Sequence, residues 1–204
     1  MLEFQNISLV FEERSIFTNL NFQIKDGEKV LLKGRSGIGK STIFNLILGF
    51  LFPQGGEILW NGRAYSPEVV REVRRSTTWL PQATNLFRDI SAIEAIELAF
   101  QNKQNKNALP DRDSMFKLAQ KYSLDLAILD KEVSTLSGGE LQRIMLIASM
   151  LQNRKLTLMD EPASALDEAT SDIIMHDIIK NTDTLLLISH NSKYDNLFSK
   201  IINL

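Results

Sequence analysis

The segment "GRSGIGKS", Gly34 to Ser41, most tightly constrains what this chain can fold into. It fits the pattern G-x-x-x-x-G-K-[ST], in which glycines let backbone N–H groups turn around phosphate oxygens. The run "KVLLKG" before it predicts a buried strand, and residues from about Ser41 to Leu51 predict an apolar helix. A strand, a glycine loop and a helix N-terminus form a phosphate-binding unit. We therefore expect an α/β protein that binds a nucleotide.

Two side chains of this phosphate loop (Gly34–Thr42) are expected to act on the ligand directly. Lys40 can reach the outer phosphates, and the Ser41 hydroxyl is placed to ligate Mg²⁺. The other positions are expected to surround the phosphates, mainly through the backbone; they are Gly34, Arg35, Ser36, Gly37, Ile38, Gly39 and Thr42.

An acidic pair follows a second buried strand, in "LTLMDEP" at residues 156–162. Open α/β sheets bind ligands at the carboxyl ends of their strands, which is where Asp160 and Glu161 fall. We expect Asp160 to hold the metal, directly or through water, and Glu161 to orient and deprotonate an attacking water. Alone, the pair would be an ordinary polar strand end. Together with the phosphate loop it predicts phosphoryl transfer.

The periodicity of apolar residues changes along the chain. Positions near every second residue are apolar over residues 2–24, which predicts strands, whereas residues 92–127 have helical character interrupted by the polar loop "QNKQNKN". Later, "KLTLMDE", "DTLLLISH" and "KIINL" predict core strands separated by helices that start near Ser137 and Asp167. Strands alternating with helices in this way predict a largely parallel, layered α/β sheet without a linker between independent domains.

Charge and composition exclude several classes of function. The formal net charge of −2 gives no electrostatic argument for nucleic acid or an acidic membrane surface. Arg71, Arg74 and Arg75 form the densest basic cluster, but Glu68 and Glu72 interleave them, which is typical of a solvated helix face. The absence of cysteine excludes disulfides, thiolate metal sites and cysteine nucleophiles.

The sequence predicts no membrane span and no signal peptide. The N-terminus "MLEFQN" has a carboxylate at its third residue, and the longest apolar run, "IFNLILGFLF", has ten residues. A bilayer crossing needs about twenty.

A second glycine pair opens a predicted helix in "STLSGGELQRIMLIASM". Ser137, Gly138 and Gly139 would present backbone N–H groups and a favourable helix dipole to an anion. In the alternative reading, Ser137 is a plain N-cap that forms a capping box with Glu140. The capping box would be compatible with anion binding, but it leaves the glycine pair unexplained. We call Ser137–Glu140 the second glycine loop.

The motifs "GRSGIGKST", "LPQ", "LSGGELQR", "LTLMDEPASALD" and "LLISH" occur in this order. In this the chain resembles the nucleotide-binding subunit of the ATP-binding cassette (ABC) superfamily, from about Phe4 to Leu204. The resemblance implies a P-loop NTPase core with a mostly parallel sheet, an N-terminal antiparallel β lobe and an inserted α-helical lobe. It implies one domain, 1–204, with core and β lobe at about 1–82 and 154–204 and the helical lobe at about 83–153. Ala163 departs from the threonine that the family often has there.

The resemblance also implies roles for four further residues. Phe11 would stack on adenine, although it could instead be a core strand residue. Gln82 would contact Mg²⁺ and the attacking water, His190 would touch the γ-phosphate, and Asp167 would reach the partner subunit while it could also cap the following helix. His176 matches no motif and is interpreted as structural.

The partners and cofactors implied by the resemblance are ATP, Mg²⁺ and a second cassette. The second glycine loop of one subunit would close over the γ-phosphate held by the other, in a homodimer or a pseudo-symmetric heterodimer. Separate membrane subunits would dock near Gln82, with Leu86 and Phe87 as apolar contacts unless those two pack in the core. The chain would then lie in the cytoplasm, on the inner face of the cell membrane, without a nucleic-acid partner.

Three functions are weighed on this basis. The favoured one is the ATPase subunit of an ABC transporter, in which ATP closes the dimer and hydrolysis reopens it. A soluble ABC ATPase with a non-transport role, such as iron–sulfur cluster assembly, is the alternative. A regulatory nucleotide-binding module without turnover is disfavoured by the presence of both Glu161 and His190.

Overall fold

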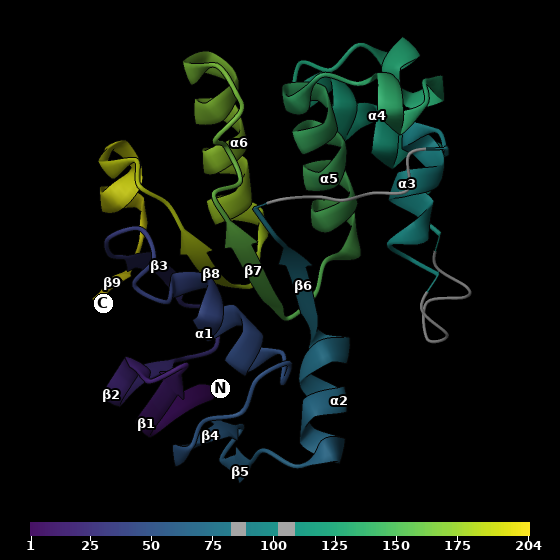
Figure 1. Cartoon of the computed structure of the whole chain (residues 1–204). Helices are drawn as coiled ribbons and strands as arrows, with labels where there is room; N and C mark the ends of the chain where they lie inside the picture. Colours follow the sequence, from purple (N-terminus) through teal and green to yellow (C-terminus); the bar gives the residue numbers. More distant parts are fainter. Residues whose placement is uncertain (83–88, 102–108) are drawn as a thin grey trace. The chain divides into compact units, whose positions relative to one another are not determined.

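The computed structural model describes residues 1–82, 89–101 and 109–204 (Figure 1). These residues form two compact units. Unit 1 comprises Met1–Thr78, Arg154–Asp160 and Asp183–Leu204, and unit 2 comprises Trp79–Asn153 and Glu161–Thr182. The proposed limits of a core and a helical lobe stay predictions.

Unit 1 contains an antiparallel sheet with the strand order β2-β1-β4-β5. The alternation noted in the sequence produces its two long strands, whose side chains point alternately into the core and toward solvent. The antiparallel β lobe expected at the N-terminus is therefore present. Its strands are β1 (Leu2–Phe11), β2 (Arg14–Ile24), β4 (Gly55–Trp60) and β5 (Arg63–Ala64).

The second sheet has the order β6-β7-β8-β3-β9, and its strands in unit 1 pair in parallel. The register places Asp160 beside Ile188 and Leu32 beside Ile188, so three strands end at one edge of the sheet. β7 and β8 are buried at every position, as expected for parallel strands covered on both faces. The strands are β3 (Lys29–Lys33), β6 (Thr77–Leu80), β7 (Leu156–Asp160), β8 (Thr184–Ile188) and β9 (Lys200–Asn203).

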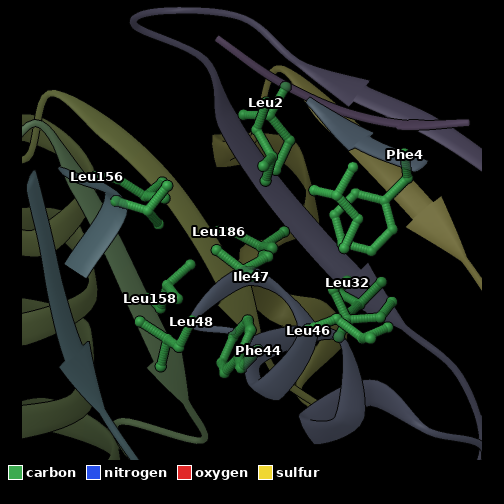
Figure 2. Packing of buried hydrophobic residues seen from close by; sticks show 14 of the residues in the cluster. Leu2, Phe4, Leu32, Phe44, Leu46, Ile47, Leu48, Leu156, Leu158 and Leu186 are labelled. Carbon is green, nitrogen blue, oxygen red and sulfur yellow. The ribbon is translucent and has the colours of Figure 1, made fainter. Parts of the chain in front are cut away.

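Helix α1 (Lys40–Ile47) packs into the main core of unit 1. Its apolar side chains join a cluster of buried residues from β1 and the parallel strands, seen closely in Figure 2. The helix ends at Ile47 rather than near Leu51 as expected. Gly49 causes the early end, because its backbone is left-handed at φ 64° and a side chain there would collide with Val70.

Helix α2 (Pro67–Ser76) exposes its three arginines as the sequence predicts, and one of them also makes a contact that was not predicted. Arg71 pairs with Glu68 at the surface, as expected for a solvated face. Arg74 instead donates from Nε to Leu48 O at 2.6 Å and from Nη2 to Gly49 O at 3.1 Å. Those carbonyls belong to the end of α1, where the last C=O groups lack helical partners and attract a cation. Arg74 is therefore a structural contact between helices.

Unit 2 is built mainly of helices joined by short 3₁₀ turns. Asp177 on α6 is almost fully buried and accepts hydrogen bonds from Tyr122 Oη at 2.6 Å and Asn181 Nδ2 at 2.5 Å, while Lys121 forms an ion pair with it. This cluster joins α4 to α6. The described helices are α3 (Ala92–Leu98), α4 (Arg112–Lys121), α5 (Gly138–Gln152) and α6 (Glu168–Asn181).

Across the described ranges, every helix falls short of the length and apolar character that a bilayer crossing requires.

Candidate functional site

The phosphate loop connects β3 to α1 as its sequence predicts. Gly37 and Gly39 have left-handed backbone angles, φ 75° and 109°, which glycine adopts without steric cost. Lys40 is only 8% exposed, and its Nζ donates to Gly34 O at 2.9 Å and to Arg35 O at 3.0 Å. The ammonium group is thus held inside the curve of the loop. A cation in this position suits an anionic ligand.

Ser41 and Asp160 meet at the carboxyl edge of the parallel sheet. The Ser41 hydroxyl donates to Asp160 Oδ2 at 2.6 Å, and Asp160 is the last residue of β7. A hydroxyl and a carboxylate are hard oxygen ligands that suit Mg²⁺, which is bound by few protein groups and completes its shell with water and phosphate. No three His, Cys, Asp or Glu side chains gather into a metal cluster in the described part of the chain. The pair therefore fits an ion that the nucleotide helps to hold.

His190 follows β8 by two residues and is exposed. Because β8 pairs with both β3 and β7, its end lies at the same edge as the phosphate loop and Asp160. The parallel sheet of unit 1 thus brings together three of the motifs found in the sequence.

Phe11 ends β1 with 60% of its surface exposed, so the alternative of a buried core residue is wrong. The neighbouring backbone is fixed by Gln54, whose Oε1 accepts from Val10 N at 2.6 Å and whose Nε2 donates to Val10 O at 2.9 Å. An exposed aromatic ring on a fixed backbone offers a flat apolar surface.

Glu161 follows β7 directly and belongs to unit 2. Its backbone is left-handed at φ 50°, an uncommon conformation for a residue with a Cβ. The Glu161 carbonyl accepts from Ser164 N at 3.2 Å and from Gln142 Nε2 at 3.1 Å. Strained residues of this kind gather at functional sites.

The second glycine loop begins α5, and its capping box is present. Ser137 Oγ accepts from Glu140 N at 3.3 Å, and Glu140 Oε2 accepts from Ser137 N at 2.7 Å. The Ser137 hydroxyl and backbone N–H lower the pKa of Glu140, because both hydrogen bonds favour the carboxylate. Ser137 and Gly138 are exposed. The predicted cap therefore forms and leaves Gly138 exposed, while Gly139 is half-buried against Ala165.

Asp167 caps α6, which was one of the two roles predicted for it. Its Oδ1 accepts from Thr170 N at 2.9 Å, and this bond lowers the pKa of Asp167. The residue is exposed while it caps the helix. His176 is an exposed residue of α6 whose Nδ1 lies 2.8 Å from Asp172 O.

Gln82 is exposed at the end of the described segment 1–82. Leu86 and Phe87, expected to contact a membrane subunit, lie outside the described residues.

Two functional candidates, Gln54 and Gln142, were not predicted from the sequence. The sequence holds a weak indication for Gln142, because it lies one helical turn after Gly139 in "LSGGELQR". No sequence feature indicates a role for Gln54.

The chain is similar to known proteins over nearly its whole length. A profile of the ABC transporter family matches residues 17–164. The probable iron export ATP-binding protein FetA of Escherichia coli is 29% identical, and the match covers 100% of this chain and 91% of that protein. The thiamine import ATP-binding protein ThiQ of Haemophilus influenzae is 32% identical, with 90% of this chain and 85% of that protein covered.

A solved structure shares the fold. It is a dimeric ATP-binding cassette in a post-hydrolysis state with ADP and phosphate, with a TM-score of 0.85, 24% identity, and coverage of 100% of this chain and 94% of the other. The parallel sheet, the antiparallel sheet and the motif order agree with this likeness. The chain therefore belongs to the ABC transporter family, as an ATP-binding and ATP-hydrolysing subunit.

Proposed function

We propose that this subunit hydrolyses ATP in composite sites, each built from two cassettes, and thereby drives transport through separate membrane subunits. The observation that carries the proposal is the 2.6 Å contact between Ser41 Oγ and Asp160 Oδ2. It joins two motifs that are far apart in the sequence at the sheet edge where α/β proteins bind their ligands.

Nucleotide binding is assigned to residues of unit 1. The phosphate loop surrounds the phosphates with N–H groups, and Lys40 neutralises their outer charge. Phe11 stacks on the adenine, which its 60% exposure allows. Ser41 and Asp160 would hold Mg²⁺, which on binding would neutralise charge on the phosphates.

The chemical step is assigned to Glu161, Gln82 and His190. Glu161 orients a water molecule and takes its proton as the water attacks the γ-phosphorus. Gln82 helps to place that water, and His190 donates a hydrogen bond toward the γ-phosphate. The fixed carbonyl of Glu161 supports this role, because a base acts only when it is held within hydrogen-bonding reach of its proton.

Gly138 supports the composite site. A side chain added at Gly138 would meet nothing within 4 Å, and its backbone is not left-handed. Among the described residues, neither packing nor backbone geometry requires glycine there, and within a helix glycine is less favourable than alanine. Close approach of a second molecule would require it. We assign that approach to the ATP held by a partner cassette, with Ser137, Gly139, Glu140 and the exposed Asp167 beside it.

Membrane subunits are assigned as the second partner, at the inner face of the membrane. Relatives with names for iron export and thiamine import are similar to this chain at nearly the same identity, so cargo is selected outside the cassette. Because both of these relatives are transport proteins, transport is favoured over iron–sulfur cluster assembly.

Replacement of the base tests the proposal. Glu161→Gln should bind ATP with unchanged affinity, lose turnover by about a thousandfold and accumulate as a dimer, because the γ-phosphate that holds the pair closed is no longer cleaved. Light scattering on size exclusion with ATP and Mg²⁺ measures the mass, and phosphate release measures turnover.

The matched control is Glu132→Gln, at an exposed position of the same unit. It should hydrolyse ATP like the wild type and dissociate after turnover. A monomeric Glu161→Gln protein at saturating ATP would overturn the composite site.

A further inference from the structure

The start of α5 and the segment after β7 are in close contact within unit 2. Gly139 and Gln142 lie three residues apart and therefore on one side of the helix. Both face residues 161–166. Gly139 is placed beside the partner's ATP in the proposed function, whereas Gln142 has no role there.

The Gln142 amide makes three hydrogen bonds to that segment. Its Nε2 donates to Glu161 O at 3.1 Å and to Ser164 Oγ at 3.3 Å, and its Oε1 accepts from Ala165 N at 2.9 Å. Both amide hydrogens and the amide oxygen are therefore used. No other amino acid offers two donors and one acceptor on a side chain of this length.

Glu161 needs such external support. Its backbone is left-handed at φ 50°, where the Cβ crowds the following carbonyl. Within the turn after it, Ser164 N donates to Glu161 O at 3.2 Å and Leu166 N donates to Ala163 O at 3.3 Å. Rotation of this peptide would redirect the Glu161 side chain.

Gly139 lets the helix approach the same segment. A Cβ at Gly139 would lie 3.0 Å from Ala165 O, which is tighter than ordinary contact, and 3.7 Å from Leu166 Cδ2. The second glycine loop and the segment of Glu161 are thus joined at two points, one of them in the loop itself.

We propose that Gln142 is a positioning residue for ATP hydrolysis: it holds the Glu161 backbone so that the carboxylate aims at the attacking water. Because Gln142 stands on the helix that starts with the second glycine loop, it also ties that loop to the base. In a closed pair the loop would touch one nucleotide and Glu161 the other, so Gln142 would couple the two sites. This inference rests on the proposed function.

A double-mutant cycle tests it. Gln142→Met keeps the side-chain length and removes all three bonds, and it should lower kcat about tenfold with KM for ATP unchanged within about twofold. In a Glu161→Gln background the same change should cause no further loss in the single-turnover rate, because the group through which Gln142 acts is gone. A merely structural role of Gln142 would lower the rate of hydrolysis by the same factor with and without Glu161.

Two further variants complete the experiment. Gln142→Glu keeps the bond from Ala165 N and loses both donors, so it should show the same coupling even if Gln142→Met folds poorly. Gln120→Met, at an exposed position of α4, is the control and should leave kcat unchanged.

A tenfold loss of rate that occurs when Glu161 is present, and not in the Glu161→Gln variant, supports the inference. Unchanged kcat in both Gln142 variants, or equal losses in both backgrounds, would overturn it while leaving wild-type turnover, and so the proposed function, intact. Absence of wild-type turnover would instead count against the proposed function.

Discussion

At the scale of single residues, the surroundings of two side chains, Phe11 and Arg74, could not be predicted in full from the sequence. Phe11 could be core or surface on its pattern, and its burial depends on where β1 ends, which is set by pairing with β2 and β4. Arg74 is exposed as expected, but its bonds to the carbonyls at the end of α1 could not be predicted because those carbonyls lie far from it in sequence. Local patterns identify residue types, whereas long-range contacts decide what those residues do.

Phe11→Ala should weaken ATP binding about tenfold, because an aromatic ring stacked on a base contributes about 1–3 kcal/mol. The free energy of unfolding should change little, since the ring is 60% exposed. Calorimetry gives the affinity and urea unfolding the stability. Val10→Ala removes an exposed neighbour on the same strand and should leave both unchanged. Equal affinity in Phe11→Ala and wild type would contradict the stacking role.

At the scale of elements, the sequence predicted which segments are helices or strands better than where they end. The phosphate loop, its strand and its helix follow from a motif with a fixed local geometry. The early end of α1 at the left-handed Gly49 was not predicted, although glycine in this conformation commonly ends helices. The hydrogen bonds from α5 to the turn after β7 could not be predicted from the sequence, since they join segments that are remote in sequence.

The capping box of α3 should make stability depend on pH. Glu94 Oε2 accepts from Ser91 N at 2.7 Å, and the bonds from Ser91 lower the pKa of Glu94 below its ordinary 4.5. A lowered folded pKa means that this stabilisation is complete above pH 4.5 and is lost as the pH falls through the folded value. The difference in unfolding free energy between wild type and Glu94→Gln should therefore shrink on acidification. Urea unfolding at neutral and acid pH measures it, and a constant difference would refute the effect.

The buried cluster that joins α4 to α6 should matter far more than a surface ion pair. Asp177→Ala would leave the Tyr122 hydroxyl buried without its acceptor and should destabilise the protein by about 3 kcal/mol. Arg71→Ala breaks the exposed pair with Glu68 and should leave the melting temperature nearly unchanged. Differential scanning calorimetry compares the two. Similar losses in both variants would show that the cluster is not a buried network.

At the scale of the whole molecule, the order of motifs predicted the fold class because each motif carries its own geometry. The sequence also posed the central problem, which is why one chain has two glycine loops at helix starts. The phosphate loop holds its lysine inward, while the second loop exposes Gly138, where an added Cβ would meet none of the described residues within 4 Å. We infer that each chain supplies half of two sites.

The most direct test is the ATPase rate per chain as the protein is diluted at saturating ATP and Mg²⁺. Phosphate release should fall steeply per chain once light scattering shows that monomers dominate, because a lone cassette lacks the partner's second glycine loop. A rate per chain that stays constant down to concentrations where only monomers exist would contradict the account.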